Sequence, residues 1–359
     1  MIETWKMTAV ENAASFIGWG GLVIGIVFGF LVARTNFCTM GSISDILSFG
    51  SYNRFRSWLL AAATAMLGVW VIQGAGMVDT SMSMYRTGDF GWGGNIIGGL
   101  VFGFGMVFAG GCASRNLVRA GGGDLRSMVV LIVMGIFAYM TIGGLLGPLR
   151  VSIFSPLTTS VGDDQSLGVL LADLLGMSVE TATTAAMAVI VLAVLIYCFK
   201  DASFRGSKAD IIGGIGIGLC VVAGWAVTGL AYDEFASNAT VISLTYVRPA
   251  GDTLDYLMRF TALGAPDFGV ASLAGALIGG FLGAAYGKRL HLTTFAGPSD
   301  AVRNMFGAAL MGIGGVLALG CTVGQALTGV STLAIGSFLT FAFIVVGGIA
   351  GIKTMENMA

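Results

Sequence analysis

The sequence predicts an all-α polytopic membrane protein made of about nine transmembrane helices, short re-entrant helices and two inverted repeats. Of its 359 residues, 56% are hydrophobic and only 10% are charged, against about 25% charged residues in an ordinary soluble domain. The apolar residues recur in uncharged blocks of about 20, the length of a helix that crosses a hydrocarbon core. The pattern around Cys112 recurs around Cys321, which indicates two related halves.

The chain is expected to form one membrane domain over residues 1–359. Residues 18–148 would be the first repeat, 181–199 a central linking span and 211–351 the second repeat. A single crossing between two like units turns the second one upside down, so we expect a pseudo-two-fold axis in the membrane plane. The nine expected spans are 18–35, 58–78, 94–112, 128–148, 181–199, 211–231, 269–287, 304–322 and 331–351.

The repeat is clearest in the segments that end at Cys112 and Cys321. In both, a Gly-x-Gly pattern precedes a Gly-Cys pair at the same offset. A weaker match between Gly25/Gly29 and Gly214/Gly218 would place the counterpart of Cys38 near Trp225 to Val227, where the second half has no cysteine. Most of the 57 glycines are explained by close helix packing, since small residues let membrane helices approach each other.

Basic residues predict the orientation, because they concentrate in cytoplasmic loops. With the N-terminus outside and the C-terminus in the cytoplasm, only Lys6, Arg86, Arg150, Arg248 and Arg259 of the 18 Lys and Arg residues fall on the outer side. The net charge of −1 argues against nucleic acid as a partner. The five cysteines form no CxxC pair, which argues against a disulfide framework.

Cys38, Cys112 and Cys321 each end a glycine-bearing apolar stretch and are followed by small or polar residues. Each pattern predicts a broken helix, and freed backbone groups are tolerated in a membrane only inside protein or beside a wet cavity. The positive ends of short helices there would attract an anion. A neutral S–H group could bind a soft sulfur atom weakly and release it again.

Polar neighbours of these cysteines are candidate anion contacts. Arg34 precedes Cys38 by one helical turn, Arg115 follows Cys112, and Asn36 lies in the first motif; alternatively, both arginines are ordinary cytoplasmic anchors. Asn116 and Gln325 stand four residues after their cysteines and would bind an oxyanion or cap a broken helix.

The remaining polar features suggest structural roles. We interpret Cys198 and Cys220 as small core residues and His291 as a surface residue. No expected span contains an interior carboxylate of the kind that couples transport to protons or sodium. Residues 163–180 fit an interfacial amphipathic helix, and the long outer loop 232–268 has no readable role.

These motifs together resemble the YeeE/YedE family of bacterial sulfur-transport membrane proteins. The resemblance rests on Asn36-Phe37-Cys38, Gly110-Gly111-Cys112-Ala113 and Gly320-Cys321-Thr322-Val323-Gly324. It implies uptake of thiosulfate or a related sulfur or selenium compound across the inner membrane, with the pore thiols carried over onto Cys38, Cys112 and Cys321. It also implies a small cytoplasmic sulfur carrier of the TusA kind as partner.

Three functions remain in competition. The first is a transporter or channel for a thiosulfate-like anion, with no cofactor and no metal. The second is a membrane thiol oxidoreductase that cycles a disulfide or persulfide, which needs two cysteines with Cα atoms no more than about 7 Å apart. The third is a conduit for a soft metal such as Cu(I), which the scattered Met residues and single His support poorly.

Overall fold

The computed structural model describes residues 2–233 and 240–358, and this part of the chain is almost entirely helical. The first half comprises α1 (Ile2–Glu11), α2 (Ala13–Thr35), α3 (Thr39–Phe49), α4 (Asn53–Gly74), α5 (Trp92–Phe108), α6 (Ala113–Gly121) and α7 (Leu125–Ile142). The second half comprises α12 (Lys208–Leu230), α13 (Val247–Leu263), α14 (Phe268–Tyr286), α15 (Pro298–Leu317), the π-helix η3 (Gly324–Gly329) and α16 (Ile335–Met358). The predicted all-α class is confirmed.

Between the halves lie α8 (Gly147–Phe154), the short helix η2 (Ser155–Leu157), α9 (Leu167–Leu175), α10 (Val179–Lys200) and α11 (Ala202–Gly206). The short helix η1 (Thr80–Met82) and strand β1 (Thr87–Phe90) precede α5, and β1 pairs antiparallel with β2 (Thr159–Asp164). The amphipathic helix expected over 163–180 therefore begins later than predicted, at Leu167, because the preceding residues form β2.

Eight helical segments in the described part of the chain are long and apolar enough to cross a membrane. They correspond to eight of the nine expected spans. The expected span 304–322 corresponds to α15 and is not among the eight. Its first two turns carry Asp300, Arg303 and Asn304, which lower the mean hydropathy of the helix.

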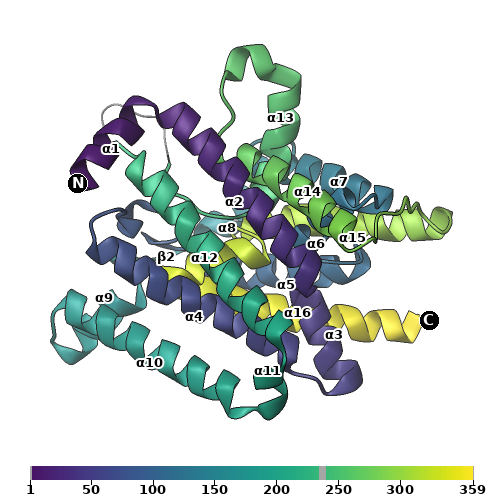
Figure 1. Cartoon of the computed structure of the whole chain (residues 1–359). Helices are drawn as coiled ribbons and strands as arrows, with labels where there is room; N and C mark the ends of the chain where they lie inside the picture. Colours follow the sequence, from purple (N-terminus) through teal and green to yellow (C-terminus); the bar gives the residue numbers. More distant parts are fainter. Residues whose placement is uncertain (1, 234–239, 359) are drawn as a thin grey trace.

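Helices from the two halves pack in reciprocal pairs. Helix α2 packs on α14 and α4 on α12, while α5 packs on α16 and α7 on α15. The pairs α2 with α12 and α5 with α15 also touch, and Figure 1 shows α2 crossing between α12 and α14. This exchange of partners is the arrangement that two repeats related by a two-fold axis would produce. The repeat boundaries themselves stay a prediction.

Glycines allow α2 and α14 to meet backbone to backbone. A Cβ atom on Gly25 would lie 2.2 Å from the carbonyl oxygen of Ser272, and one on Gly279 would lie 2.1 Å from that of Ile26. No side chain fits at such distances, so these positions require glycine. The predicted packing role of these glycines is therefore confirmed.

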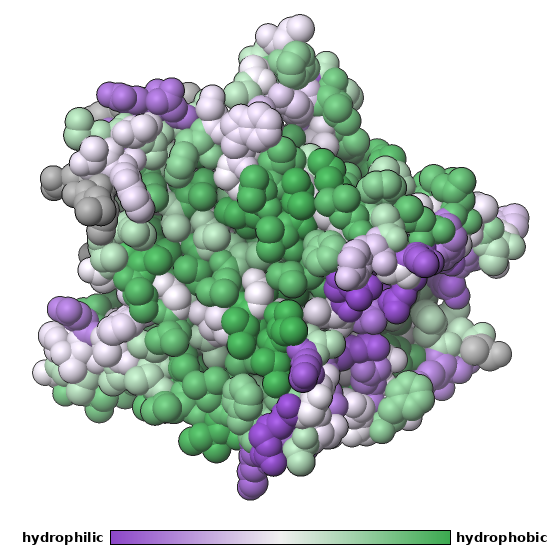
Figure 2. Space-filling model, viewed as in Figure 1, coloured by the Kyte–Doolittle hydropathy of each residue, from purple (hydrophilic) through white to green (hydrophobic). Residues whose placement is uncertain are grey.

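The surface carries a broad apolar face between polar ends. Figure 2 shows continuous hydrophobic side chains over the middle of the molecule, where Figure 1 places α2, α12 and α14. Hydrophilic side chains gather at the upper left and along the lower right. Such a belt fits a hydrocarbon environment, where an apolar surface is the stable one.

The long connection predicted at 232–268 contains a helix of its own. Helix α13 occupies Val247–Leu263 and is interrupted by non-helical backbone at Arg259. It projects from the top of the view in Figure 1 and packs on α7, α14 and α15. Residues 234–239 of this connection lie outside the described residues.

Candidate functional site

Helices α5 and α15 end in the same way. At each end, two backbone N–H groups bond back into the last turn: Gly110 and Gly111 to Val107 and Met106, and Leu319 and Gly320 to Val316 and Gly315. Gly110 (φ +71°) and Leu319 (φ +57°) occupy the same left-handed position. This conformation terminates a helix and suits glycine, whereas for Leu319 it costs about 1–2 kcal/mol. Both helices therefore break one residue before the Gly-Cys pair.

Each of the three cysteines stands directly before a short helical segment. Cys38 precedes α3 and its Sγ accepts a hydrogen bond of 3.4 Å from the Gly41 N–H, and the Cys321 Sγ accepts one of the same length from Gly324. Cys112 precedes α6. A thiol is a weaker acceptor than the Ser, Thr, Asn or Asp usually found at this position. The backbone N–H groups in the first turn of these helices can therefore still donate to another acceptor.

The three thiols form a connected group in the interior. Cys112 and Cys321 are fully buried and Cys38 is 6% exposed. The Cys112 side chain interacts with those of Cys38 and Thr322 and lies 3.4 Å from the Ser114 hydroxyl. The Cys321 Sγ lies 3.9 Å from the Thr245 hydroxyl and within electrostatic range of Cys112. The order of these groups through the interior is thus Thr245, Cys321, Cys112 and Cys38.

A cavity of about 240 Å³ approaches Cys321 from the predicted outer side. Thr245 and Gly320, both beside Cys321, lie in its wall. The charged groups of the wall are Arg150 of α8, Arg248, Asp252 and Asp267, and Arg248 is paired with Asp252. The Arg150 Nε is buried without a hydrogen-bond partner, and a terminal nitrogen of the same group donates to the Ile142 carbonyl over 3.2 Å. The cavity therefore contains a cationic group with donor capacity to spare.

Arg150 differs from the other arginines of the predicted outer side. Arg86 pairs with Asp164, Arg248 with Asp252 over 3.5 Å, and Arg259 with Asp255 over 3.3 Å. Among the described residues, no carboxylate lies within ion-pairing distance of Arg150. This difference could not be predicted from the sequence, because pairing depends on tertiary contacts.

A second cavity, of about 220 Å³, approaches Cys38 and Cys112 from the predicted cytoplasmic side. Its wall includes Asn36, whose Oδ1 accepts a bond of 3.4 Å from Arg115. Four guanidinium groups and one carboxylate, that of Asp124, lie in this wall, so its charge is positive: Arg115, Arg119, Arg126 and Arg289. A positive cavity concentrates small anions.

Asp124 holds two of these arginines in place. Arg119 lies 2.5 Å and Arg126 3.2 Å from its carboxylate oxygens. Burial favours the neutral acid, but the two guanidinium groups outweigh burial, and the pKa of Asp124 is lowered below its ordinary value. The group therefore stays ionised at neutral pH and neutralises part of the local charge, while Arg115 has no carboxylate partner among the described residues.

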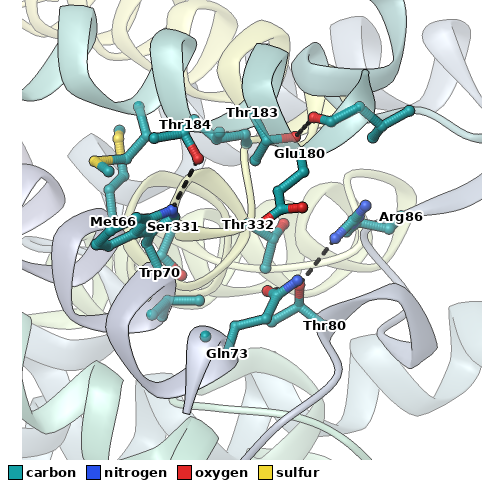
Figure 3. Close-up of a pocket in the computed structure, with 15 residues that line it drawn as sticks. Met66, Trp70, Gln73, Thr80, Arg86, Glu180, Thr183, Thr184, Ser331 and Thr332 are labelled. Atoms are coloured by element: carbon teal, nitrogen blue, oxygen red, sulfur yellow. Dashed lines mark hydrogen bonds between the residues drawn. The ribbon is translucent and has the colours of Figure 1, made fainter. Parts of the chain in front are cut away.

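A third cavity, of about 430 Å³, lies between α4, α10 and residues 331–333 (Figure 3). Figure 3 shows Trp70 donating to Thr184, and Arg86 and Gln73 meeting at Thr80. The cationic group of this wall, Arg86, is already paired with Asp164, unlike Arg150 and Arg115 of the other two walls. This cavity therefore suits an anion less well than the other two.

The remaining residues predicted to contact the anion are Arg34, Asn116 and Gln325. Arg34 lies outside the inner cavity, with its guanidinium 4.9 Å from the centre of the Tyr286 ring, as an anchor on α14 would. The Asn116 amide donates to the carbonyl of Gly111 over 2.8 Å, and that of Gln325 donates to Ala318. Capping of a broken helix was the alternative left open for Asn116 and Gln325, and it explains why their amide groups bind these carbonyls.

Other expectations can now be located. Cys198 packs with Leu60 and Phe204, Cys220 lies in the main core, and His291 is exposed, as predicted. The position predicted for the counterpart of Cys38, near Trp225 to Val227, is wrong, because those residues lie inside α12. By the order of helices, the residue before α13 takes that place, and it is Tyr246.

No group of three His, Cys, Asp or Glu side chains among the described residues could hold a metal ion. Two cavities lie on opposite sides of a buried group of thiols, and each has in its wall an arginine without a carboxylate partner among the described residues, which is the arrangement of a membrane transport protein. The chain belongs to the sulphur transport family, whose sequence pattern matches residues 34–350. It transports a sulfur compound and is not an enzyme.

Individual relatives agree with this assignment. The chain is 24% identical to the thiosulfate transporter TsuA of Escherichia coli over 91% of each chain. It is 26% identical to the TsuA of Spirochaeta thermophila over 92% of this chain and 96% of the relative. A probable transporter YedE of Escherichia coli is 28% identical over 29% of this chain and 24% of its own length.

Proposed function

We propose that this protein takes up thiosulfate, or a closely related sulfur or selenium anion, and passes it along Cys321, Cys112 and Cys38. The single observation that supports this most is the buried line of contacts from Thr245 to Cys38, which lies between two cavities with unpaired arginines. The relatives named thiosulfate transporter support the substrate.

The thiols would act through weak, repeated binding. An S–H group interacts favourably with the soft terminal sulfur of thiosulfate but carries no charge to retain or repel the ion. Three such groups in sequence let the ion exchange one partner for the next, and weak sites in series permit release. Neither cavity includes a thiol in its wall, so a small rearrangement at the thiols would accompany each passage.

The arginines would supply attraction at each end. Arg150 would collect the anion on the outer side, and Arg115, beside Asn36, would receive it on the inner side. Both guanidinium groups lack a carboxylate partner among the described residues, so their charge is available to a solute. Arg34 has no part in this path, since it lies outside the cavity.

Thiol replacement tests the proposal. Cys112→Ala and Cys321→Ala are made in a cell that lacks other sulfur importers, and growth on thiosulfate as the sulfur source is measured. Both variants should grow far more slowly than wild type, while Cys198→Ala, a buried thiol in a separate cluster with Leu60 and Phe204, should not. Unchanged growth of Cys112→Ala and Cys321→Ala at normal expression would remove the thiol path.

Two further points belong to the same proposal. The protein would lie in the bacterial inner membrane with its N-terminus outside, which places the inner cavity and its arginines on the cytoplasmic side. A small TusA-like carrier would then accept the sulfur compound there. Copurification of such a carrier with the detergent-solubilised protein would support this partner, and loss of copurification on reversing the charge of Arg289 would locate its surface.

A further inference from the structure

Two thiols of the path, those of Cys38 and Cys321, are each followed by a residue whose buried hydroxyl forms no hydrogen bond. Thr39 follows Cys38 directly, Thr322 follows Cys321 directly, and neither hydroxyl has a partner. Thr322 is fully buried, and its side chain lies close to that of Cys112 without a hydrogen bond between them. A buried polar group without a partner is uncommon and calls for an explanation, such as an absent ligand.

Two tyrosines extend this set around Cys321. The hydroxyls of Tyr85 and Tyr246 are buried without a partner, and both lie within electrostatic range of Cys321. Tyr246 packs its ring 5.2 Å from that of Phe28, and Tyr85 packs edge-on to Trp225 at 6.5 Å. The rings are therefore fixed by core packing, while their polar ends lie near the thiol.

Tyr246 also occupies the place in the second half that Cys38 occupies in the first. Each is the residue directly before the helix that follows the aligned span of its half: Cys38 precedes α3, the helix after α2, and Tyr246 precedes α13, the helix after α12. The two halves thus present a thiol at one of these positions and a phenol at the other. A purely structural residue would not require a phenol whose hydroxyl has no partner.

We propose that Tyr85, Tyr246 and Thr322 bind the oxygen atoms of the transported anion while the thiols face its sulfur. This inference rests on the proposed function and names the groups that recognise the second end of the ion. A sulfonate end carries three oxygens that accept hydrogen bonds, and hydroxyl groups are suitable donors. Donors to a charged acceptor form the stronger class of hydrogen bond.

This arrangement explains how the path would select an ion with two unlike ends. Thiols by themselves accept any soft sulfur species, and hydroxyls by themselves accept any oxyanion. The combination favours an anion that has both a terminal sulfur and oxygens. Selectivity then depends on groups that are left unpaired when the wrong solute enters, which is a strong form of discrimination.

The test measures thiosulfate uptake into liposomes that contain the purified protein. Tyr246→Phe, Tyr85→Phe and Thr322→Val each remove a hydroxyl and keep most of the volume, so the KM for thiosulfate should rise about tenfold or more. Thr322→Ser keeps the hydroxyl and loses a methyl group, so its KM should stay near wild type. Tyr256→Phe is the control, because that hydroxyl lies on the exposed part of α13 and donates to Gly264.

The outcomes separate the two proposals. If the wild-type protein takes up no thiosulfate, the proposed function fails and this inference fails with it. If the wild-type protein is active but the three variants keep the wild-type KM, only the hydroxyl inference is overturned. A larger loss in Thr322→Ser than in Thr322→Val would likewise overturn it, since side-chain volume rather than the hydroxyl would then be the cause.

Discussion

Asn116 and Gln325 anchor the two halves of the molecule in the same way, each by donating its amide to the carbonyl of a residue seven positions earlier. The acceptors are Ala109 and Ala318, which end the last turns of α5 and α15. Asn116 also donates to the carbonyls of Gly111 and Cys112 and accepts from Ser127. These amides satisfy the carbonyls that a broken helix leaves free, and they hold the cysteines between two helix ends.

This relationship predicts a large effect of Asn116→Asp on stability. The change preserves the shape of the side chain but replaces the donor amide with a carboxylate that faces three carbonyl oxygens. Because a buried charge would then be unpaired, we expect a loss of about 3 kcal/mol or more. The apparent melting temperature of the purified protein in detergent measures this. Asn12→Asp, at an exposed end of α1, is the control, and equal melting temperatures for the two variants would contradict the anchoring role.

A second prediction concerns capture of the anion on the outer side. Arg150→Gln removes a guanidinium with no carboxylate partner, so the KM for thiosulfate uptake should rise about tenfold while the maximal rate changes little. Arg259→Gln removes a guanidinium that is already paired with Asp255 and lies outside the wall of this cavity, so it is the matched control. Added salt should raise the KM of wild type more than that of Arg150→Gln, because screening weakens only a charge that is present. Equal KM values for the two variants would count against a role for Arg150.

The contact between α2 and α14 gives a third prediction. Gly279→Ala places a Cβ atom 2.1 Å from the Ile26 carbonyl oxygen, so the helices must separate, at a cost of about 2 kcal/mol. Gly74→Ala, at the end of α4, meets nothing within 4 Å and should leave stability unchanged. Thermal unfolding in detergent compares the two. A Gly279→Ala protein as stable as wild type would show that the helices do not pack so closely.

The fourth prediction follows from the lowered pKa of Asp124. A carboxylate whose pKa is lower in the folded protein contributes stability above its unfolded pKa of about 3.9, and this contribution is lost as the pH falls through the folded pKa. Asp124→Asn should therefore melt at a lower temperature than wild type at pH 7. The difference should shrink below about pH 4. Melting curves in detergent between pH 3 and pH 7 measure it, and a difference that is constant with pH would exclude the ionised Asp124 as its source.

Local patterns were sufficient for much of the fold. Uncharged apolar blocks predicted the spans to within several residues, because a hydrocarbon core fixes the length and composition of any helix that crosses it. The Gly-Cys pairs predicted the helix breaks at Cys112 and Cys321, since glycine favours the left-handed residue that ends a helix. The span corresponding to α15 was located as well, although its polar first turns lower its hydropathy.

The candidate site was only partly predictable. Repetition in the sequence identified Cys112 and Cys321, and the motif at Cys38 completed the group. Arg150 and Arg248 look equivalent in the sequence, yet Arg248 is paired with Asp252, whereas Arg150 has no carboxylate partner among the described residues. Tyr246 was missed because the alignment of the halves fails after α12, where the connection in the second half is longer.

The sequence by itself determined that this chain is a membrane protein with a pattern that recurs around Cys112 and Cys321 and with cysteines at interrupted helices. These properties depend on composition and short-range pattern, which the bilayer and the helix geometry translate directly into structure. Only the tertiary structure decided which arginines remain unpaired, which hydroxyls lie beside the thiols, and that Asn116 and Gln325 support the backbone. Those properties depend on contacts between residues far apart in the chain, and a single sequence does not encode such contacts in any local pattern.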